Sequence, residues 1–223
     1  MASLARVGVY NRPLINDIIP LLNAASLREL SNQSLSNLMT GLGRFGVTST
    51  IKNPIWSHFS NEVERRLQVP SEWKNSDLVA CALAYSSANR AKQEKTPNIL
   101  FSSISRAIVS ESVVLDVPCV LKYIKACSRV EFRDVESLSV CANVLRNTNE
   151  FPAKIDTREL LELYTNLDKL GIDMIDVETE LRDRKIQIPE SKHKTWFPQS
   201  RVKKGKKSLS TSTDSLRKRK YSW

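Results

Sequence analysis

The sequence has few of the residues on which metal sites, disulfide frameworks and membrane spans depend. It contains 4 cysteines, 2 histidines, 6 glycines and 9 prolines in 223 residues. No two cysteines form a C-x-x-C pair, and His58 lies far from His193, so no metal-ligand spacing is present. No apolar run reaches 18 residues, which argues against a membrane span. The low glycine and proline content argues against a fibrous or disordered chain.

Apolar segments with helical spacing hold all four cysteines: Cys81, Cys119, Cys127 and Cys141. We expect them to be buried, reduced thiols, which is typical of an intracellular or matrix compartment. Before Asp17 the N-terminal segment contains Arg6 and Arg12 and no acidic residue. This composition is compatible with a weak mitochondrial presequence and equally with an ordinary N-terminus.

No group of residues predicts catalysis. Neither histidine has an evident nucleophile beside it in sequence, and paired carboxylates such as Glu62 and Glu64 are expected on a charged, solvated helical face. We therefore expect a protein that is not an enzyme and that uses no cofactor and no small-molecule substrate.

One pattern recurs along the chain at intervals of about 40 residues. Residues 35–47 (LSNLMTGLGRFGV) align with residues 160–172 (LLELYTNLDKLGI) at a shift of 125, so that Leu42 meets Leu167 and Gly46 meets Gly171. Shifts of 40 and 85 give two weaker copies, in which Ala82 and Cys127 take the place of Leu42. Such a period is typical of an α-solenoid, whose helical pairs stack because none can bury its apolar face alone.

The apolar spacing predicts helices throughout the first 189 residues, and no segment shows the alternation of a strand, so the predicted class is all-α. The expected helices cover about 14–22, 26–47 as one or two helices, 53–68, 76–89, 97–110, 118–130, 135–145, 158–170 and 174–184. Ser31 or Ser34 is the expected N-cap before the repeated pattern, and Gly46 the expected stop. Asp156 or Thr157 is expected to cap the fourth copy.

Charge divides the chain into a near-neutral body and a basic tail. Residues 190–223 hold eleven Lys and Arg against two acids, a balance of +9, which leaves 23 bases and 22 acids in residues 1–189. We expect an N-terminal extension or capping helix at 1–25, a helical-repeat domain at 26–189 and a basic, mostly irregular tail at 190–223. This asymmetry indicates an arm that binds a polyanion.

The tail combines cations that could neutralise phosphates with aromatic rings that could stack on bases. The candidate RNA-binding residues are Lys192, Lys194, Trp196, Arg201, Lys203, Lys204, Lys206, Lys207, Arg217, Lys218, Arg219, Lys220, Tyr221 and Trp223. Three other interpretations of the tail are a nuclear localisation signal, attraction to anionic lipid and a plain solubilising tail. The tail has too little apolar surface to offset an ordering entropy of about 1–2 kcal/mol per residue, so we expect it to be ordered only by a partner.

Two further motifs each have a functional and a structural interpretation. Residues 41–46 (GLGRFG) match the G-x-G-x-x-G dinucleotide fingerprint, but a helical pattern precedes them, which favours close helix packing and a helix stop at Gly46. Arg44, Arg129 and Lys169 share one position of the repeat. They could meet RNA, as in RNA-reading helical repeats, or could complement a helix C-terminus, and Ala84 at the same position favours the second interpretation.

The order of leucine, small residue, base, aromatic residue or leucine, and glycine in residues 35–47 and 160–172 resembles the heptatricopeptide and octotricopeptide repeats of organellar proteins, including FAST-kinase-like proteins. The resemblance covers roughly Ser26 to Lys185 and is clear in two copies. It implies a right-handed stack of helical hairpins that works with mitochondrial or plastid RNA. The terminal RAP-type, nuclease-like domain of that family is absent, so no cleavage activity is implied.

A short helical stack with a basic, aromatic-ended tail also looks like the accessory subunits of divergent mitochondrial ribosomes. The resemblance implies a structural subunit in the mitochondrial matrix, with rRNA bound by the tail and neighbouring proteins bound by the helical body. The alternative is a scaffold subunit of another mitochondrial complex, respiratory or RNA-processing, in which the body does the binding.

Overall fold

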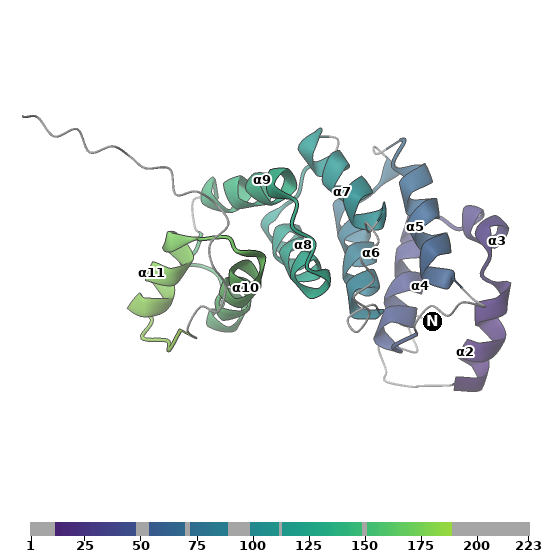
Figure 1. Cartoon of the computed structure of the whole chain (residues 1–223), viewed down its shortest axis with the longest axis horizontal. Coiled ribbons are helices and arrows are strands. Elements are labelled where there is room, and N and C mark those ends of the chain that lie inside the picture. The colour runs from purple at the N-terminus through teal and green to yellow at the C-terminus, as the bar shows by residue number, and fades with distance from the viewer. Residues whose placement is uncertain are drawn as a thin grey trace, which may run out of the picture.

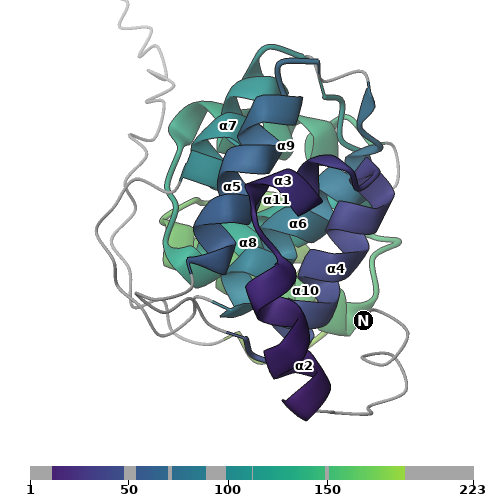
Figure 2. The same cartoon turned by 90° about the vertical axis from the view of Figure 1, so that its right-hand side faces the viewer.

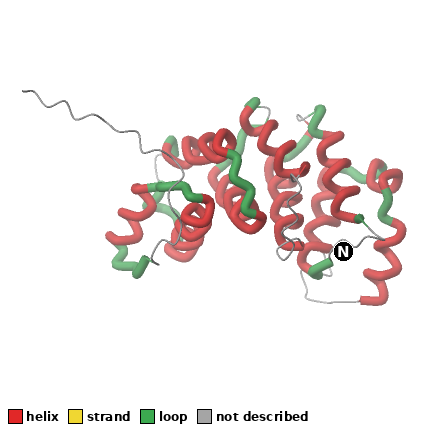
Figure 3. The backbone as a smooth tube through the Cα atoms, in the orientation of Figure 1, coloured by secondary structure: helices red, strands yellow, loops and turns green. Residues whose placement is uncertain are grey.

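The structure is a computed structural model that describes residues 12–47, 54–69, 72–88, 99–111, 113–148 and 151–188. Helices and connecting turns make up these residues, and no strand occurs among them (Figure 3). The predicted all-α class is confirmed for this part of the chain.

The helix bounds follow the apolar periodicity closely. In chain order the elements are α2 (Arg12–Ile18), the 3₁₀ turn η1 (Ile19–Leu21), α3 (Ala24–Arg28), α4 (Asn32–Arg44), α5 (Ile55–Arg66), α6 (Asn75–Ala88), α7 (Ile99–Val109), α8 (Val117–Val130), α9 (Val135–Arg146), α10 (Thr157–Leu170) and α11 (Ile175–Asp183). The predicted segment 26–47 is two helices, and the predicted domain boundary at residue 25 falls inside α3.

Alternate helices pack against one another and form two rows. The first row consists of α4, α6, α8 and α10, and the second row consists of α3, α5, α7 and α9 (Figure 1). α11 packs against α10 but makes little contact with α9, so the second row is interrupted before its last helix. The view turned by 90° shows α2 projecting away from the rest of the helices (Figure 2).

A continuous apolar core lies between the rows and extends from Leu27 in α3 to Leu181 in α11. Its helices supply stripes with three- and four-residue spacing, such as Phe59 and Val63 in α5, which are fully buried. Val135 is an exception to the prediction for residues 135–145. It is 55% exposed, because it is the first residue of α9 and lies at the end of the stripe.

Consecutive helices form four pairs: α4 with α5, α6 with α7, α8 with α9, and α10 with α11. Aromatic rings connect successive pairs within this core. Trp56 of α5 lies 5.8 Å from Tyr85 of α6, centroid to centroid, and Tyr85 lies 6.2 Å from Phe101 of α7. Phe101 in turn lies 6.4 Å from Tyr123 of α8 and 5.4 Å from Phe132 in the turn that follows α8. Edge-on and tilted contacts, and the stacked contact of Phe101 with Tyr123, add to the burial of each ring.

Side-chain caps begin α3, α4, α8, α9 and α10, whereas α5 and α11 have none. Ser31 is the N-cap of α4 and accepts a hydrogen bond from the Ser34 backbone N–H, and Asp156 caps α10 in the same way at Arg158. Both positions agree with the sequence prediction, because short polar side chains satisfy the free N–H groups of a first turn.

Three of the four repeat copies end their first helix in the same backbone motif. In α4 the Val47 N–H donates to the Leu42 carbonyl over 3.0 Å around Gly46, which has φ +67°. In α10 the aligned residues Ile172 and Leu167 make the same bond, again over 3.0 Å. α8 repeats it between Phe132 and Cys127, but a glutamate, Glu131, takes the left-handed position with φ +55°. The second copy has Ser86 at this position, and α6 continues to Ala88.

Glu131→Gly should therefore stabilise the protein. A residue with a Cβ is strained by about 1–2 kcal/mol in the left-handed region. Glycine removes this strain but adds conformational entropy to the unfolded chain, so the free energy of unfolding should rise by roughly 0.5–1 kcal/mol. The control is Gly46→Ala, which introduces the same strain without a clash, because a Cβ there would meet no atom within 4 Å. Urea unfolding should show opposite shifts for the two variants, and a destabilised Glu131→Gly would contradict the interpretation.

Candidate nucleic-acid interface

The fourteen tail residues to which RNA contacts are assigned, from Lys192 to Trp223, lie outside the described residues. Nothing in the described body tests them. The helices of the body also carry basic residues on their surface.

The repeated basic position lies in the last turn of three first-row helices. Arg44 of α4 and Lys169 of α10 are exposed there. Arg129 of α8 is half-buried and donates a hydrogen bond from Nη1 to Ser87 Oγ of α6 over 2.9 Å. Each cation complements a helix C-terminus, an effect of about 0.3–1 kcal/mol. The position thus has a structural role in all three helices.

A basic stripe on α8 was missed by the sequence reasoning. Lys122, Lys125 and Arg129 are three and four residues apart and therefore share one side of the helix. Lys122 is exposed, and Lys125 Nζ pairs with Glu162 Oε1 of α10 over 2.6 Å. The three-and-four spacing of the cations was the available signal. α8 is the third of the four first-row helices, so the stripe lies between α6 and α10 on that row.

Residues 41–46, the G-x-G-x-x-G match, form the end of α4 and its cap. A Cβ on Gly43 would lie 2.7 Å from the Ala84 carbonyl oxygen of α6, so this glycine permits the close approach of α4 and α6. A helix precedes the glycines, whereas a dinucleotide fingerprint needs a strand there. The packing interpretation is confirmed at Gly43, and the helix stop at Gly46.

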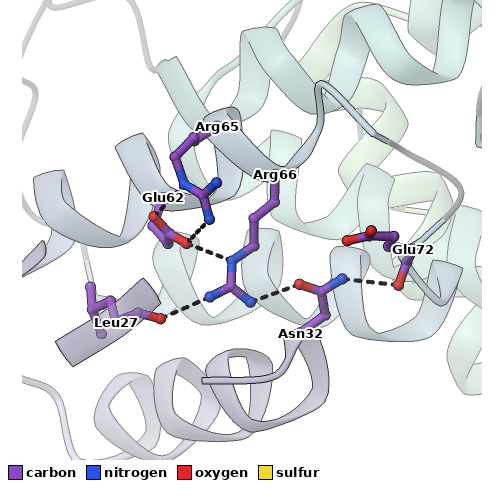
Figure 4. A network of polar contacts seen from close by, with 6 residues as sticks. All are labelled: Leu27, Asn32, Glu62, Arg65, Arg66 and Glu72. Atoms are coloured by element: carbon purple, nitrogen blue, oxygen red, sulfur yellow. Dashed lines mark hydrogen bonds and ion pairs between the residues drawn. The ribbon is translucent and has the colours of Figure 1, made fainter. Parts of the chain in front are cut away.

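A buried arginine joins three helices near the N-terminal end of the body (Figure 4). Arg66, at the end of α5, donates from Nε to Glu62 over 2.6 Å, from Nη1 to Asn32 Oδ1 of α4 over 2.8 Å and from Nη2 to the Leu27 carbonyl of α3 over 2.8 Å. Asn32 in turn donates to the Glu72 carbonyl over 2.9 Å. All three nitrogens of the guanidinium are thereby used in fixing α3, α4 and α5.

The expectation that Glu62 lies on a solvated face was wrong. Glu62 is only 5% exposed, because it shares the inward side of α5 with Phe59 and Val63. Arg65 also donates to it, over 2.7 Å. Burial raises the pKa of Glu62, but the hydrogen bonds from Arg65 and Arg66 outweigh this, and the net pKa is below its ordinary value.

The last helical pair has an equivalent clamp. Arg184, after α11, bonds Glu180 four residues earlier over 2.7 Å, Thr157 Oγ1 at the start of α10 over 3.0 Å and the Ile155 carbonyl over 2.8 Å. The motif in both pairs is Glu-x-x-x-Arg, with the arginine at the end of the second helix and its targets at the start of the first. The glutamate–arginine spacing was visible in the sequence, but nothing there marked it as buried.

Glu62→Gln should lower the free energy of unfolding at pH 7 by about 2–4 kcal/mol, because Arg66 is left buried without its counter-charge. A carboxylate with a lowered folded pKa contributes stability above its unfolded value of 4.5, and this contribution is lost as the pH falls through the folded pKa. The difference between wild type and variant should therefore shrink below about pH 4.5 in urea unfolding.

Glu64→Gln is the matched control, because Glu64 pairs over 3.2 Å with Arg106, whose side chain is 71% exposed. Its effect should stay within about 0.5 kcal/mol at every pH. Equal losses of unfolding free energy for the two variants would show that the buried Glu62–Arg66 pair contributes no more than an exposed ion pair.

Two grooves open on the described surface. The first, of about 630 Å³, lies beside the Arg66 clamp and is lined by Arg28, Leu30, Ser31, Asn32, Gln33, Arg65, Arg66, Val69, Glu72, Lys74 and Asp77. The second, of about 500 Å³, follows α5, α7 and the start of α9 and is lined by Glu64, Leu67, Gln68, Ser103, Ser105, Arg106, Ala107, Val109, Ser110, Asp134 and Glu136. The charged lining residues give the first groove a balance of +2 and the second −2.

The residues that the structure describes contain neither a metal-binding cluster nor a membrane-spanning helix. No three histidine, cysteine or acidic side chains gather there in a way that could hold a metal ion. None of the described helices is both long and apolar enough to cross a membrane.

The four cysteines are buried free thiols, as the sequence predicts. Burial raises the pKa of Cys81, Cys119 and Cys141 to about 12 each. It also raises the pKa of Cys127, which lies against Tyr123. Since the thiolate is the reactive form, such thiols are unreactive at neutral pH.

In the native protein at pH 8, a disulfide reagent such as DTNB should therefore titrate almost no thiol over minutes. After unfolding in guanidinium chloride, all 4 cysteines should react, because exposure returns each pKa to its ordinary value. Rapid native reaction of any cysteine would show that its helix opens readily.

No protein-family model matches the chain, and no curated protein matches it.

Proposed function

We propose that this chain is an α-solenoid of about four helical pairs that associates with RNA through its basic tail at residues 190–223. It is a non-enzymatic, structural subunit of a ribonucleoprotein, and the mitochondrial ribosome in the matrix is the assembly that the organellar-repeat resemblance suggests. The tail binds rRNA, and the helical body contacts neighbouring proteins.

The division of charge is the observation that carries the RNA part of this proposal. Residues 190–223 have a balance of +9, against +1 for the rest of the chain. Several cations of the body bond other helices or turns, among them Arg66, Arg129 and Arg184. The positive excess of the sequence lies in residues 190–223, where several phosphate contacts could be made.

The two-row packing supports the solenoid part. Each first-row helix from α6 onward packs on the preceding first-row helix, which is how repeat proteins bury a core through neighbour contacts. The aligned left-handed caps at Gly46, Glu131 and Gly171 support a common ancestry of three copies.

A scaffold function in another mitochondrial complex is the second candidate, and one feature of the body favours it. The first residues of α7, α9 and α11 are all exposed and apolar: Ile99 at 45%, Val135 at 55% and Ile175 at 73%. They recur at the same end of successive second helices and could contact a neighbouring protein.

Deleting residues 190–223 distinguishes RNA binding by the tail from a scaffold function of the body. RNA affinity of the full chain should fall steeply with salt, because several phosphate contacts each release counterions. The truncated chain should lose most of that affinity, as measured by fluorescence anisotropy with labelled single-stranded RNA.

A control variant keeps the tail length but replaces Lys203, Lys204, Lys206 and Lys207 by glutamine, and it should show a smaller salt slope. RNA affinity that survives the deletion unchanged would overturn the tail assignment. Retention of protein partners by the truncated chain, with no RNA bound by either form, would favour the scaffold function.

A further inference from the structure

We propose that the first groove, between α3, α5 and the starts of α4 and α6, binds the phosphodiester backbone of RNA as a second contact, separate from the tail. This inference rests on the proposed RNA function and adds a site on the helical body. It lies at the N-terminal end of the molecule, far along the chain from residues 190–223.

The cations of this groove have donor capacity to spare. Arg28 and Lys74 are exposed, and neither has an ion-pair partner among the described residues. Arg65 is 52% exposed and uses Nε and Nη2 on Glu62, which leaves Nη1 for a ligand. Arg and Lys side chains are the main phosphate binders of proteins, and Arg28, Arg65 and Lys74 come from three different segments around one groove.

The carboxylates near the groove do not cancel these charges. Glu72 and Asp77 line it, and Glu62 lies beneath its floor. Glu62 is occupied by Arg65 and Arg66, and Asp77 is in the first turn of α6, where the helix N-terminus stabilises a negative charge. Four cations against all three carboxylates still leave +1 around the groove.

Backbone donors add to the side chains. α4 has 13 residues and α6 has 14, and the two helices pack together. Both begin at the groove, since Ser31, Asn32 and Gln33 belong to the start of α4 and Lys74 immediately precedes α6. The positive dipole end of α4, whose first turn holds no acidic residue, favours a bound phosphate, whereas α6 already carries Asp77 in its first turn.

The second groove provides a contrast within the same chain. It has similar size, but its charged lining is Arg106 against Glu64, Asp134 and Glu136. Asp134 is already engaged by Ser105 and by the N-terminus of α9, and its pKa is lowered: burial raises it, but these hydrogen bonds prevail. A phosphate would be repelled there, so groove shape alone does not select the ligand.

The test uses the full chain with two double variants of equal charge change. Arg28→Gln with Lys74→Gln removes two of the three exposed cations of the first groove, and Arg106→Gln with Arg146→Gln removes two exposed cations elsewhere. The affinity for a labelled single-stranded RNA is measured at several salt concentrations. The first variant should reduce the salt slope by about 1.4 and weaken binding several-fold at 0.1 M salt, because about 0.7 is lost per phosphate contact on a single strand. The second should leave the slope unchanged.

A crosslinking readout does not depend on the stability of these variants. A photoreactive benzoylphenylalanine replaces Gln33, an exposed residue of the first groove, or Gln68, an exposed residue of the second. Irradiation in the presence of RNA should attach RNA at position 33 and not at position 68.

The outcomes distinguish this inference from the proposed function. RNA binding by the wild type with equal slopes for the two double variants and no crosslink at position 33 would overturn the groove contact and leave the tail contact intact. Crosslinking of position 33 to a protein in place of RNA would overturn it in favour of an acidic protein partner. Absence of any RNA binding by the full chain would overturn both.

Discussion

Burial between the two rows is the interaction on which the rest of the structure depends. No single helix here covers its own apolar stripe, and each helix from α3 to α10 packs against a helix two positions away in the chain. The aromatic contacts from Trp56 to Tyr123 run through this layer and cross from pair to pair. The stability of one pair is therefore tied to that of its neighbours, as it is in repeat proteins.

The two arginine clamps lie in the first and the last of the four pairs. Arg66 and Arg184 tie the two helices of their own pairs together. The corresponding arginines of the inner pairs reach other pairs instead: Arg106 bonds Glu64 of α5, and Arg146 approaches Asp176 of α11. Arg66 and Glu62 form a buried ionic tie within the first pair, and Arg184 and Glu180 form a half-buried one within the last.

The sequence predicts the backbone of this molecule better than its polar interior. Period 3.6 locates the helices, and small polar or glycine residues at their ends, such as Ser31 and Gly46, mark the caps, because both signals are local. Glu62 was misplaced because its burial depends on what its partner Arg66 reaches, namely Asn32 of α4 and the Leu27 carbonyl of α3, which lie 34 and 39 residues from Arg66 in sequence.

The first groove could not be predicted for the same reason, since its cations Arg28, Arg65 and Lys74 come from separate segments that only the packing of α3, α5 and α6 brings together. The α8 stripe, by contrast, was readable from spacing alone. The assignment of RNA contacts to the tail stays a prediction, because those residues lie outside the described part of the chain.

The second row is interrupted between α9 and α11, and this break separates the fourth pair from the first three. Across it the fourth pair is joined mainly through α8 and α10, with an exposed Arg146–Asp176 approach of 3.9 Å on the other side. An exposed pair of this kind is worth at most about 1 kcal/mol. In hydrogen exchange, the amides of α10 and α11 should thus form a cooperative unit of their own, which separates from the first three pairs before these unfold.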